Sequence, residues 1–395
     1  MKLLIISKNL LDQKDAQSQQ SLAFIEALQE MFERIDVITA KTTDSDLNRL
    51  NHLETKNVKL YSLPAQWVSS GSNIIEKVKR KLHRNLMAAF STKWAKTAGN
   101  LANDLSRKKN YSAIITIGLP IESHMAGLRL KEKSKWIAHF SDPWPESIMP
   151  KPYSDYSIPV INRLQKNVVQ KTIDQAKLVS FTCTQSRSLF SAHYKINVNK
   201  TYITPHAAPP PITPLKRSDG DFIITHAGSL SRERFFPELF YAIKNLPKES
   251  KVIVQFIGYV HPAAQQLVEM LEIQHRVVFI GQLRKVDTIH RLRESDALLL
   301  IEAKMEIYPF LPSKLADYSV FGLPVYAITG TESATAQILD SDCNSHISTY
   351  SVSDISGVLQ NISVPKEGEF KNLLYANFSK SKIQNIVKSA IFKMV

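Results

Sequence analysis

The chain has 395 residues, of which 50 are Lys or Arg and 36 are Asp or Glu, giving a formal net charge of +14. Its hydrophobic content of 44% and charged content of 22% exclude wholesale disorder, and its length suffices for two or three domains. Its two cysteines exclude a disulfide framework or paired-cysteine zinc site, favouring a reducing compartment. No run of about 18 apolar residues predicts a membrane span, and the first residues are expected to form a strand rather than a signal peptide.

The first half of the sequence alternates short apolar runs with amphipathic segments. Strands are predicted at residues 2–7, 34–40, 57–63, 112–117, 135–140, 178–183 and 200–205. Helices are predicted at residues 17–32, 74–94, 123–133, 158–175 and 185–194. Strands separated by helices of this length indicate parallel βαβ units.

The positive charge is concentrated between Ile74 and Asn110, which hold ten Lys or Arg and two acids. Apolar residues recur there every three or four positions, at Ile75, Val78, Leu82, Leu86, Phe90 and Trp94. This pattern predicts a basic amphipathic helix over 74–94. Such a helix, close to Trp67, either lies on an anionic membrane surface or packs its apolar stripe into the core. Nucleic acid is a less favoured partner, because no nucleic-acid-binding motif accompanies the charge.

A proline-rich stretch at residues 206–220 interrupts the alternation and is predicted to be an interdomain linker. Beyond it, strands are predicted at residues 222–228, 251–258, 276–281, 297–303 and 323–329. Helices are predicted at residues 237–245, 262–273, 286–294, 313–321 and 366–395.

The predicted fold class is therefore α/β, with two Rossmann-like doubly wound domains facing across a cleft. The first is expected to span residues 1–205 and the second residues 221–375. A final helix at about 376–395 is expected to pack back on the first domain. In such folds the ligand binds at the carboxyl ends of the strands, here in the cleft.

Several chemistries are disfavoured because their motifs are missing from the sequence. There is no GxGxxG dinucleotide fingerprint and no GxxxxGK[ST] phosphate loop, which argues against a dehydrogenase or a P-loop ATPase. There is also no HExxH or GxSxG motif. We expect no metal and no cofactor.

Two segments of the second half suit a diphosphate. HAGSLSRERFFPEL places a small-residue turn and two arginines after a strand. PFLPSKLADYSVFGLPV places Ser313 as the expected cap of a helix, Lys314 in its first turn and Asp317 one turn in. A helix start with a free Lys, facing an Arg from another loop, favours a diphosphate, and a carboxylate nearby can accept hydrogen bonds from ribose hydroxyls. The sequence therefore predicts a nucleoside-diphosphate site without a P-loop.

The order and spacing of these motifs resemble those of retaining GT-B glycosyltransferases of the large family 4, used in bacterial surface-polysaccharide assembly. The matching segments run from Ile115 to Ile328: ITIGLPIESHMAGL, KWIAHFSDPW, AKLVSFTCTQS, ITPHAAPPP, GSLSRERFFPEL, GQLRKVDTIHRLRESDALLLI and PSKLADYSVFGLPVYAI. The resemblance implies metal-independent sugar transfer, with retention, from a nucleoside-diphosphate sugar to a saccharide acceptor.

A lipid-linked acceptor would explain the basic helix 74–94 as an anionic-membrane contact. The protein is then expected in the cytoplasm or on the inner face of the cell membrane. An epimerase or hydrolase acting on the nucleotide sugar is the alternative, and a basic nucleic-acid-binding protein is a weaker one.

The resemblance also implies roles for residues around the diphosphate. Arg234, with Arg232 as a close rival, matches the phosphate-binding arginine of the family. Lys314 would neutralise charge on the leaving diphosphate. Gly228 and Ser229 would let the backbone approach the phosphates, although a plain tight turn explains them equally well.

Other implied roles concern the ribose, the base and the donor sugar. Asp317 stands where the family usually has Glu and would bind the ribose. The family's other acid would fall on Pro309, so Glu306 is a candidate substitute. Backbone groups of three residues would face the base: Gly281, Gln282 and Leu283.

Two residues of the first domain complete the set. The resemblance places His124 against the donor sugar, and a buried core or capping histidine is the alternative. Asp142, in Ser-Asp-Pro-Trp, either faces the acceptor or only organises the turn at Pro143.

Overall fold

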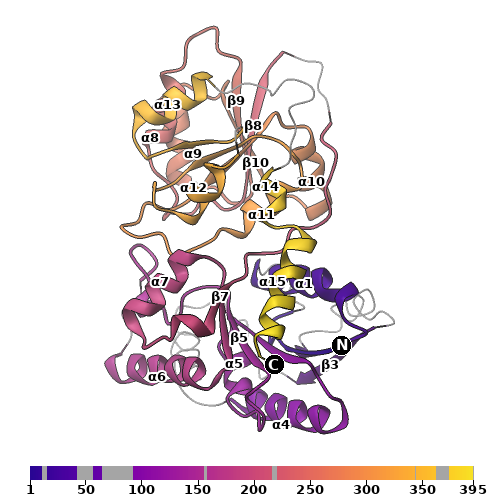
Figure 1. The fold of residues 1–395 in the computed structure, drawn as a ribbon. Helices are drawn as coiled ribbons and strands as arrows, with labels where there is room; N and C mark the ends of the chain where they lie inside the picture. The colour runs from indigo at the N-terminus through magenta and orange to yellow at the C-terminus, as the bar shows by residue number, and fades with distance from the viewer. Residues whose placement is uncertain are drawn as a thin grey trace. The chain divides into compact units, whose positions relative to one another are not determined.

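The computed structural model describes residues 1–10, 16–41, 57–64, 92–154, 158–215, 220–342, 344–361 and 373–394 (Figure 1). Its contacts divide the chain into two compact units. Unit 1 contains Met1–Met149, Tyr153–Ala207 and Lys380–Val395. Unit 2 contains Pro150–Pro152 and Ala208–Ser379. Of the predicted basic helix 74–94, all but residues 92–94 lie outside the described residues.

Unit 1 is built on a seven-stranded parallel sheet in the order β3-β2-β1-β4-β5-β6-β7. Its strands are β1 (Lys2–Ile6), β2 (Arg34–Lys41), β3 (Val58–Pro64), β4 (Ala113–Gly118), β5 (Trp136–Phe140), β6 (Leu178–Phe181) and β7 (Thr201–Ile203). Ile5 in β1 pairs with Val37 on one side and Ile115 on the other. Such continuous apolar runs are typical of parallel strands covered on both faces.

Helices form a layer on each face of this sheet. They are α1 (Ala16–Leu28), α4 (Lys93–Lys108), α5 (Glu122–Gly127), α6 (Pro159–Gln175), α7 (Thr184–His193) and α15 (Lys380–Phe392). Leu3 and Ile5 enter the core that contains Phe24 of α1 and Ile383 of α15, whereas neighbouring β1 side chains enter the opposite core. Helices α1 and α15, from opposite ends of the chain, lie side by side in Figure 1.

Two predicted helices of unit 1 differ from those observed. Thr92 caps α4 by accepting a hydrogen bond from the backbone of Ala95, so no continuous helix runs from 74 to 94. Trp94 is buried, so the described end of the predicted apolar stripe faces the core. Helix α5 ends at Gly127 instead of at the predicted residue 133. At this end of the helix, Lys133 Nζ donates a hydrogen bond to the carbonyl oxygen of Gly127.

Unit 2 repeats the doubly wound arrangement with six parallel strands in the order β10-β9-β8-β11-β12-β13. Its strands are β8 (Phe222–Ala227), β9 (Val252–Ile257), β10 (Val277–Gly281), β11 (Ala297–Ile301), β12 (Val325–Ile328) and β13 (His346–Ser348). Its helices are α8 (Glu238–Lys244), α9 (Pro262–Met270), α10 (Lys285–Arg293), α11 (Ser313–Ser319), α12 (Ala334–Leu339), α13 (Val352–Asn361) and α14 (Leu373–Ala376). The predicted fold class of two Rossmann-like units is confirmed.

Three elements, β13, α12 and α13, were not predicted, because residues 330–361 are rich in Ser and Thr, which favour caps and turns. The predicted final helix 366–395 is interrupted, since residues between Ala376 and Lys380 separate α14 from α15. Strand order reverses between β1 and β4 in unit 1 and between β8 and β11 in unit 2. Ligands of doubly wound sheets bind beside the carboxyl ends of such strand pairs.

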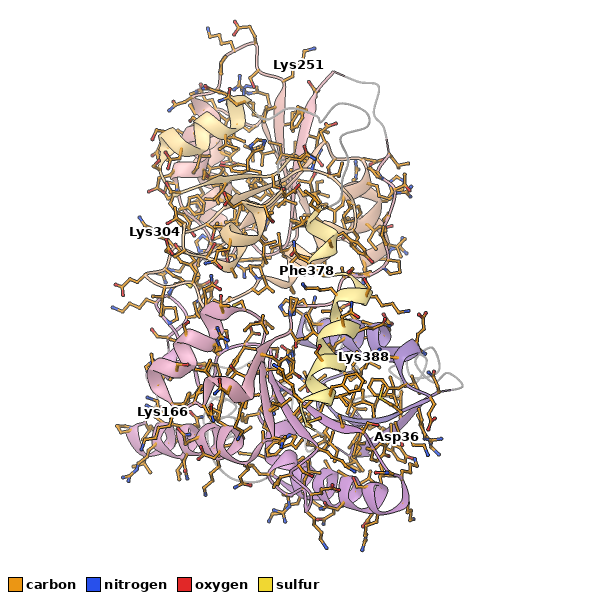
Figure 2. The ribbon with its side chains drawn as sticks, in the orientation of Figure 1. Asp36, Lys166, Lys251, Lys304, Phe378 and Lys388 are labelled. Carbon is orange, nitrogen blue, oxygen red and sulfur yellow. The ribbon has the colours of Figure 1, made fainter. Side chains whose placement is uncertain are left out.

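A buried carboxylate, Asp36, lies in β2 (Figure 2). It accepts hydrogen bonds from Arg34 Nε at 3.0 Å and Lys109 Nζ at 2.7 Å, and from the Tyr111 hydroxyl. Burial raises the pKa of Asp36, but the bonds from Lys109 and Tyr111 outweigh it, and the net pKa lies below its ordinary value. The cluster therefore ties β2 to the segment that leads from α4 into β4.

Replacing Arg276 by Met should destabilise unit 2. This buried guanidinium donates to the carbonyl oxygens of Leu246 at 3.1 Å and Pro247 at 2.6 Å, where the chain leaves α8. Methionine keeps the apolar stem but leaves these carbonyl groups unpaired, which costs about 2 kcal/mol. Urea unfolding would measure the loss, with the exposed Arg291→Met as a control that should change stability by less than about 0.5 kcal/mol.

Candidate functional site

The candidate site lies at the carboxyl end of β8, at the switch point of unit 2. A Cβ atom added to Gly228 would lie 2.2 Å from Lys314 Cε and 2.9 Å from Lys314 Nζ. The Lys314 side chain therefore lies directly over the Gly228 backbone. Gly258, with φ +121°, approaches from β9, where a Cβ would lie 2.5 Å from the Gly228 carbonyl oxygen. Glycine at 228 leaves room for the lysine side chain, and glycine at 258, with its positive φ, lets the two backbones approach each other.

Helix α11 carries Lys314 and is held in place by Tyr318. The Tyr318 hydroxyl accepts a hydrogen bond from the Ala227 backbone at 2.8 Å and donates to the Leu299 carbonyl at 3.3 Å. Tyr318 is buried, so these bonds fix the helix over β8 and β11. Ser313, predicted as the helix cap, is instead the first helical residue, because Pro312 occupies the cap position and makes no side-chain capping bond.

Arg234 is the second cation of the site. It lies in the turn after β8, where its Nη1 donates to the Ser229 carbonyl oxygen at 3.4 Å. Its Nε is buried and has no hydrogen-bond partner in the described chain. Within the described ranges, neither Arg234 nor Lys314 forms an ion pair with a carboxylate. Burial lowers the pKa of Lys314, the negative charge of Asp317 opposes this shift, and the positive charge of Arg234 reinforces it, so the net pKa lies below its ordinary value.

The structure thus brings Gly228, Ser229, Arg234 and Lys314 together. Asp317 extends from the same helix as Lys314 with an exposed side chain. Four other predicted residues are also exposed: Arg232, Gln282, Leu283 and Glu306. Gly281 ends β10 with φ +83°, and its carbonyl accepts a bond from the Gly258 backbone at 2.8 Å.

Two buried residues beside this site were not predicted from the sequence. His226 precedes Gly228 by two residues and is 1% exposed. Glu302 follows β11, where it accepts a bond from the Thr329 hydroxyl, and burial raises its pKa to about 7. Polar residues at the ends of two apolar strands were the available signal, but sequence alone does not show which face of the sheet they occupy.

In unit 1 the structure places His124 in the core, with 0% of its surface exposed. Its Nδ1 is 2.8 Å from the Thr116 hydroxyl, and a Cβ on Gly118 would lie 2.6 Å from its Nε2. Burial lowers the pKa of His124 to about 3, so the imidazole is neutral. Asp142 is half-buried just beyond β5.

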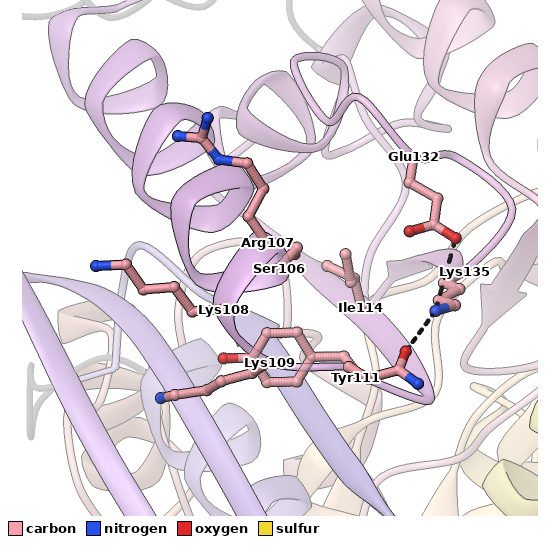
Figure 3. Close-up of a pocket in the computed structure, with 9 residues that line it drawn as sticks. Ser106, Arg107, Lys108, Lys109, Tyr111, Ile114, Glu132 and Lys135 are labelled. Carbon is pink, nitrogen blue, oxygen red and sulfur yellow. Dashed lines mark hydrogen bonds and ion pairs between the residues drawn. The ribbon is translucent and has the colours of Figure 1, made fainter.

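Two pockets lie elsewhere in unit 1. One of 380 Å³ is bounded by β7 and α15, and none of the predicted site residues line it. The other, of 280 Å³, lies where α4 leads into β4 (Figure 3). Figure 3 shows Lys135 bonded to Glu132 and Asn110, while Arg107 and Lys108 extend away from them. This pocket is at the amino end of β4, opposite the edge where ligands of such sheets bind.

Within the described ranges, no three His, Cys, Asp or Glu side chains are grouped as they would be to hold a metal ion. A search of the same residues finds no helix with the length and apolarity needed to span a bilayer.

A methyl group on Gly228 should displace Lys314 and weaken the binding of the diphosphate that the sequence predicts at this turn. In Gly228→Ala the new Cβ would overlap Lys314 Cε, and the flexible end of the lysine can move away with little loss of stability. We expect the affinity for a nucleoside diphosphate to fall about tenfold, because one charge-assisted hydrogen bond is lost. Calorimetry would measure it, with Gly357→Ala as control, since nothing lies within 4 Å of a Cβ there. Unchanged nucleoside-diphosphate affinity in Gly228→Ala would contradict this prediction.

The sequence matches no protein-family model and no curated protein. Solved structures do match. HepE of Anabaena in complex with UDP is 12% identical, with a TM-score of 0.65 and both chains covered over 100% of their length. The lipopolysaccharide outer core galactosyltransferase WaaB is 13% identical, with a TM-score of 0.63 and full coverage of both chains. Sucrose-phosphate synthase from Thermosynechococcus elongatus is 14% identical, with a TM-score of 0.65 over 100% of this chain and 97% of that one. These similarities show that the chain has the GT-B fold.

Proposed function

We propose that this protein is a glycosyltransferase that transfers a sugar, with retention, from a nucleoside-diphosphate sugar to a saccharide acceptor in bacterial polysaccharide biosynthesis. Unit 2 binds the donor and unit 1 the acceptor, and the reaction needs no metal. The family 4-like motifs support retention. The fold shared with UDP-bound and UDP-glucose-bound HepE, and with WaaB, supports the reaction class and the pathway.

One observation carries the proposal: two cations that form no ion pair with a carboxylate in the described chain lie around Gly228 at the switch point of unit 2. Lys314 covers the glycine backbone, and Arg234 leaves a buried Nε without an acceptor. Unpaired buried donors cost about 1–3 kcal/mol each, so this arrangement is suited to an anionic ligand that supplies acceptors. A diphosphate offers several oxygens and the opposite charge.

The chemistry that follows is electrostatic. As the bond between the donor sugar and the diphosphate lengthens, negative charge grows on the leaving oxygens, and Lys314 and Arg234 stabilise it. The sugar acquires oxocarbenium character, and the acceptor hydroxyl attacks the anomeric carbon on the side of the leaving group. The departing phosphate oxygen takes the acceptor proton. Asp317 accepts hydrogen bonds from the ribose.

A thermal-shift screen with UDP, GDP, ADP and their sugars tests this function. A ligand at 100 times its Kd adds about 2.7 kcal/mol of stability, which raises the unfolding temperature measurably. Incubating the stabilising nucleotide sugar with and without saccharide acceptors then identifies the reaction. Free sugar or an isomerised nucleotide sugar formed without acceptor would indicate a hydrolase or epimerase instead. No stabilisation by any nucleotide or nucleotide sugar would overturn the proposal.

We further propose that the acceptor is lipid-linked and that the basic region of unit 1 contacts an anionic membrane from the cytoplasmic side. The described part of that region is α4, whose outer face exposes Lys93, Lys96, Arg107 and Lys108. Lys166 of α6 adds a cation to the same layer of helices (Figure 2).

Reversing two of these charges should weaken membrane binding. In Lys93→Glu/Lys96→Glu, each lost basic residue removes about 1 kcal/mol of attraction, so the partition coefficient should fall at least about tenfold. Pelleting with vesicles of phosphatidylglycerol and phosphatidylethanolamine measures it. The matched control is Lys248→Glu/Lys251→Glu, the same change on exposed lysines of unit 2. Equal pelleting of the two variants would contradict the proposed membrane contact.

A further inference from the structure

His226 is held in one tautomer by the strand beside it. Its Nδ1 lies 2.9 Å from the carbonyl oxygen of Leu299 in β11. A carbonyl oxygen only accepts hydrogen bonds, so Nδ1 carries the proton and Nε2 presents a lone pair. Burial, together with the charges of Lys314 and Arg234, lowers the pKa of His226 to about 3, which keeps the ring neutral.

The lone pair of His226 faces the same spot as the Lys314 ammonium. Nε2 lies 3.3 Å from the position that a Cβ would take on Gly228, and Lys314 Nζ lies 2.9 Å from that position. The distance between His226 Nε2 and Lys314 Nζ is therefore no larger than the sum of these two distances. Nε2 is buried and has no hydrogen-bond partner within the described residues. An acceptor without a donor thus lies beside an ammonium with three donors.

We propose that His226 is a positioning residue whose Nε2 accepts one hydrogen bond from the Lys314 ammonium, after a small rotation of the lysine side chain. This bond directs the two remaining N–H groups of Lys314 away from the sheet, over Gly228, where the diphosphate of the proposed function would lie. The proposal deepens that function and rests on it for the identity of the ligand.

A neutral imidazole suits this task better than a carboxylate. A buried Asp or Glu at 226 would pair with Lys314 and cancel the charge that the ligand needs. The neutral ring satisfies one donor and leaves the full positive charge available. Since Nδ1 is already bonded to Leu299, the ring cannot turn its lone pair away without losing a buried bond.

Two near-isosteric variants separate positioning from a structural role. Glutamine places its amide near the location of Nε2, so His226→Gln keeps an acceptor for Lys314 but loses the bond to Leu299. Asparagine places its amide near Nδ1, so His226→Asn keeps the bond to Leu299 and loses the acceptor. The probes are UDP and inorganic pyrophosphate, titrated by calorimetry against each full-length variant whose circular dichroism matches the wild type.

If His226 positions Lys314, His226→Asn should bind both probes with about tenfold lower affinity than the wild type. The affinity of His226→Gln should stay within about threefold of the wild-type value. In the Lys314→Met background, both substitutions should leave the remaining affinity unchanged, because the group they act through is gone. If His226→Gln bound the probes more weakly than His226→Asn, the histidine would have a purely structural role and the proposal would be overturned.

A ligand-free readout keeps this inference distinct from the proposed function. In ¹⁵N-histidine NMR spectra, the Nε2 resonance of His226, assigned from its loss in His226→Gln, should be that of an unprotonated nitrogen and should shift in Lys314→Met. An unchanged resonance in Lys314→Met overturns the positioning role, whatever ligand the protein binds. A shifted resonance in a protein that binds neither UDP nor pyrophosphate supports the His226–Lys314 bond and refutes the donor site.

Discussion

Replacing Lys314 or Arg234 by alanine is expected to lower kcat about 100-fold or more, the usual cost of removing a group that stabilises charge in the transition state. Both cations lie at Gly228 and neither forms an ion pair with a carboxylate in the described chain, so the proposed function assigns their charge to the diphosphate. The effect should exceed that on donor affinity, because the leaving oxygens carry more negative charge in the transition state than in the bound donor. Steady-state kinetics with the stabilising nucleotide sugar would measure it.

Two controls sharpen this result. Lys251→Ala removes an exposed lysine of unit 2 (Figure 2) and should retain wild-type turnover. Arg232→Ala decides between the two arginines of the loop: Arg232 is exposed, whereas Arg234 has a buried Nε. Near-normal turnover in both Lys314→Ala and Arg234→Ala would refute the site. A large loss in Arg232→Ala alone would assign the phosphate contact to Arg232.

Replacing Asp36 by Asn is expected to destabilise the protein by about 3 kcal/mol, since removing one partner of a buried ion pair leaves the others uncompensated. The buried carboxylate accepts bonds from Arg34, Lys109 and Tyr111, and asparagine cannot match its charge. Chemical unfolding followed by circular dichroism would measure the loss. Asp104→Asn is the control: its ion pair with Arg107 is exposed, and the loss should stay below about 1 kcal/mol.

The contribution of Asp36 should depend on pH in a defined direction. Its pKa in the folded state is lowered below the unfolded value of about 3.9. The stabilisation is therefore fully present above that unfolded value and is lost as the pH falls through the folded pKa. The difference in unfolding free energy between the wild type and Asp36→Asn should stay constant from about pH 5 to 8 and shrink below about pH 4. A difference that did not shrink in acid would show that the charge of Asp36 is not what stabilises the fold.

The strands were predictable because each is a short apolar run set between helical or turn segments. KLLII, AIITIG and ALLLI are buried on both faces, which marks central strands of a parallel sheet wherever they occur. The alternation of such runs with helices of ordinary length then restricts the fold to doubly wound units. The segments that were not predicted, α12, β13 and α13, lie in a stretch rich in Ser and Thr, so their local signals are weak and packing within unit 2 decides their conformation.

The site was predictable only in part. Gly228, Arg234 and Lys314 could be selected because their local patterns each suit a phosphate. His124 shows the limit, since its sequence context does not reveal that Thr116 and the Gly118 backbone enclose it in the core.

By itself, the sequence determined two Rossmann-like units and the cationic residues beside the carboxyl ends of their strands, because apolar periodicity and turn chemistry are local properties. Only the tertiary structure decided that Tyr318 holds α11 over β8, that Lys314 covers Gly228 and that the unpaired Nε2 of His226 lies close to Gly228 as well. These contacts join residues up to 91 positions apart. Their distances depend on how the sheet twists and how the helix packs on it, which no local pattern encodes.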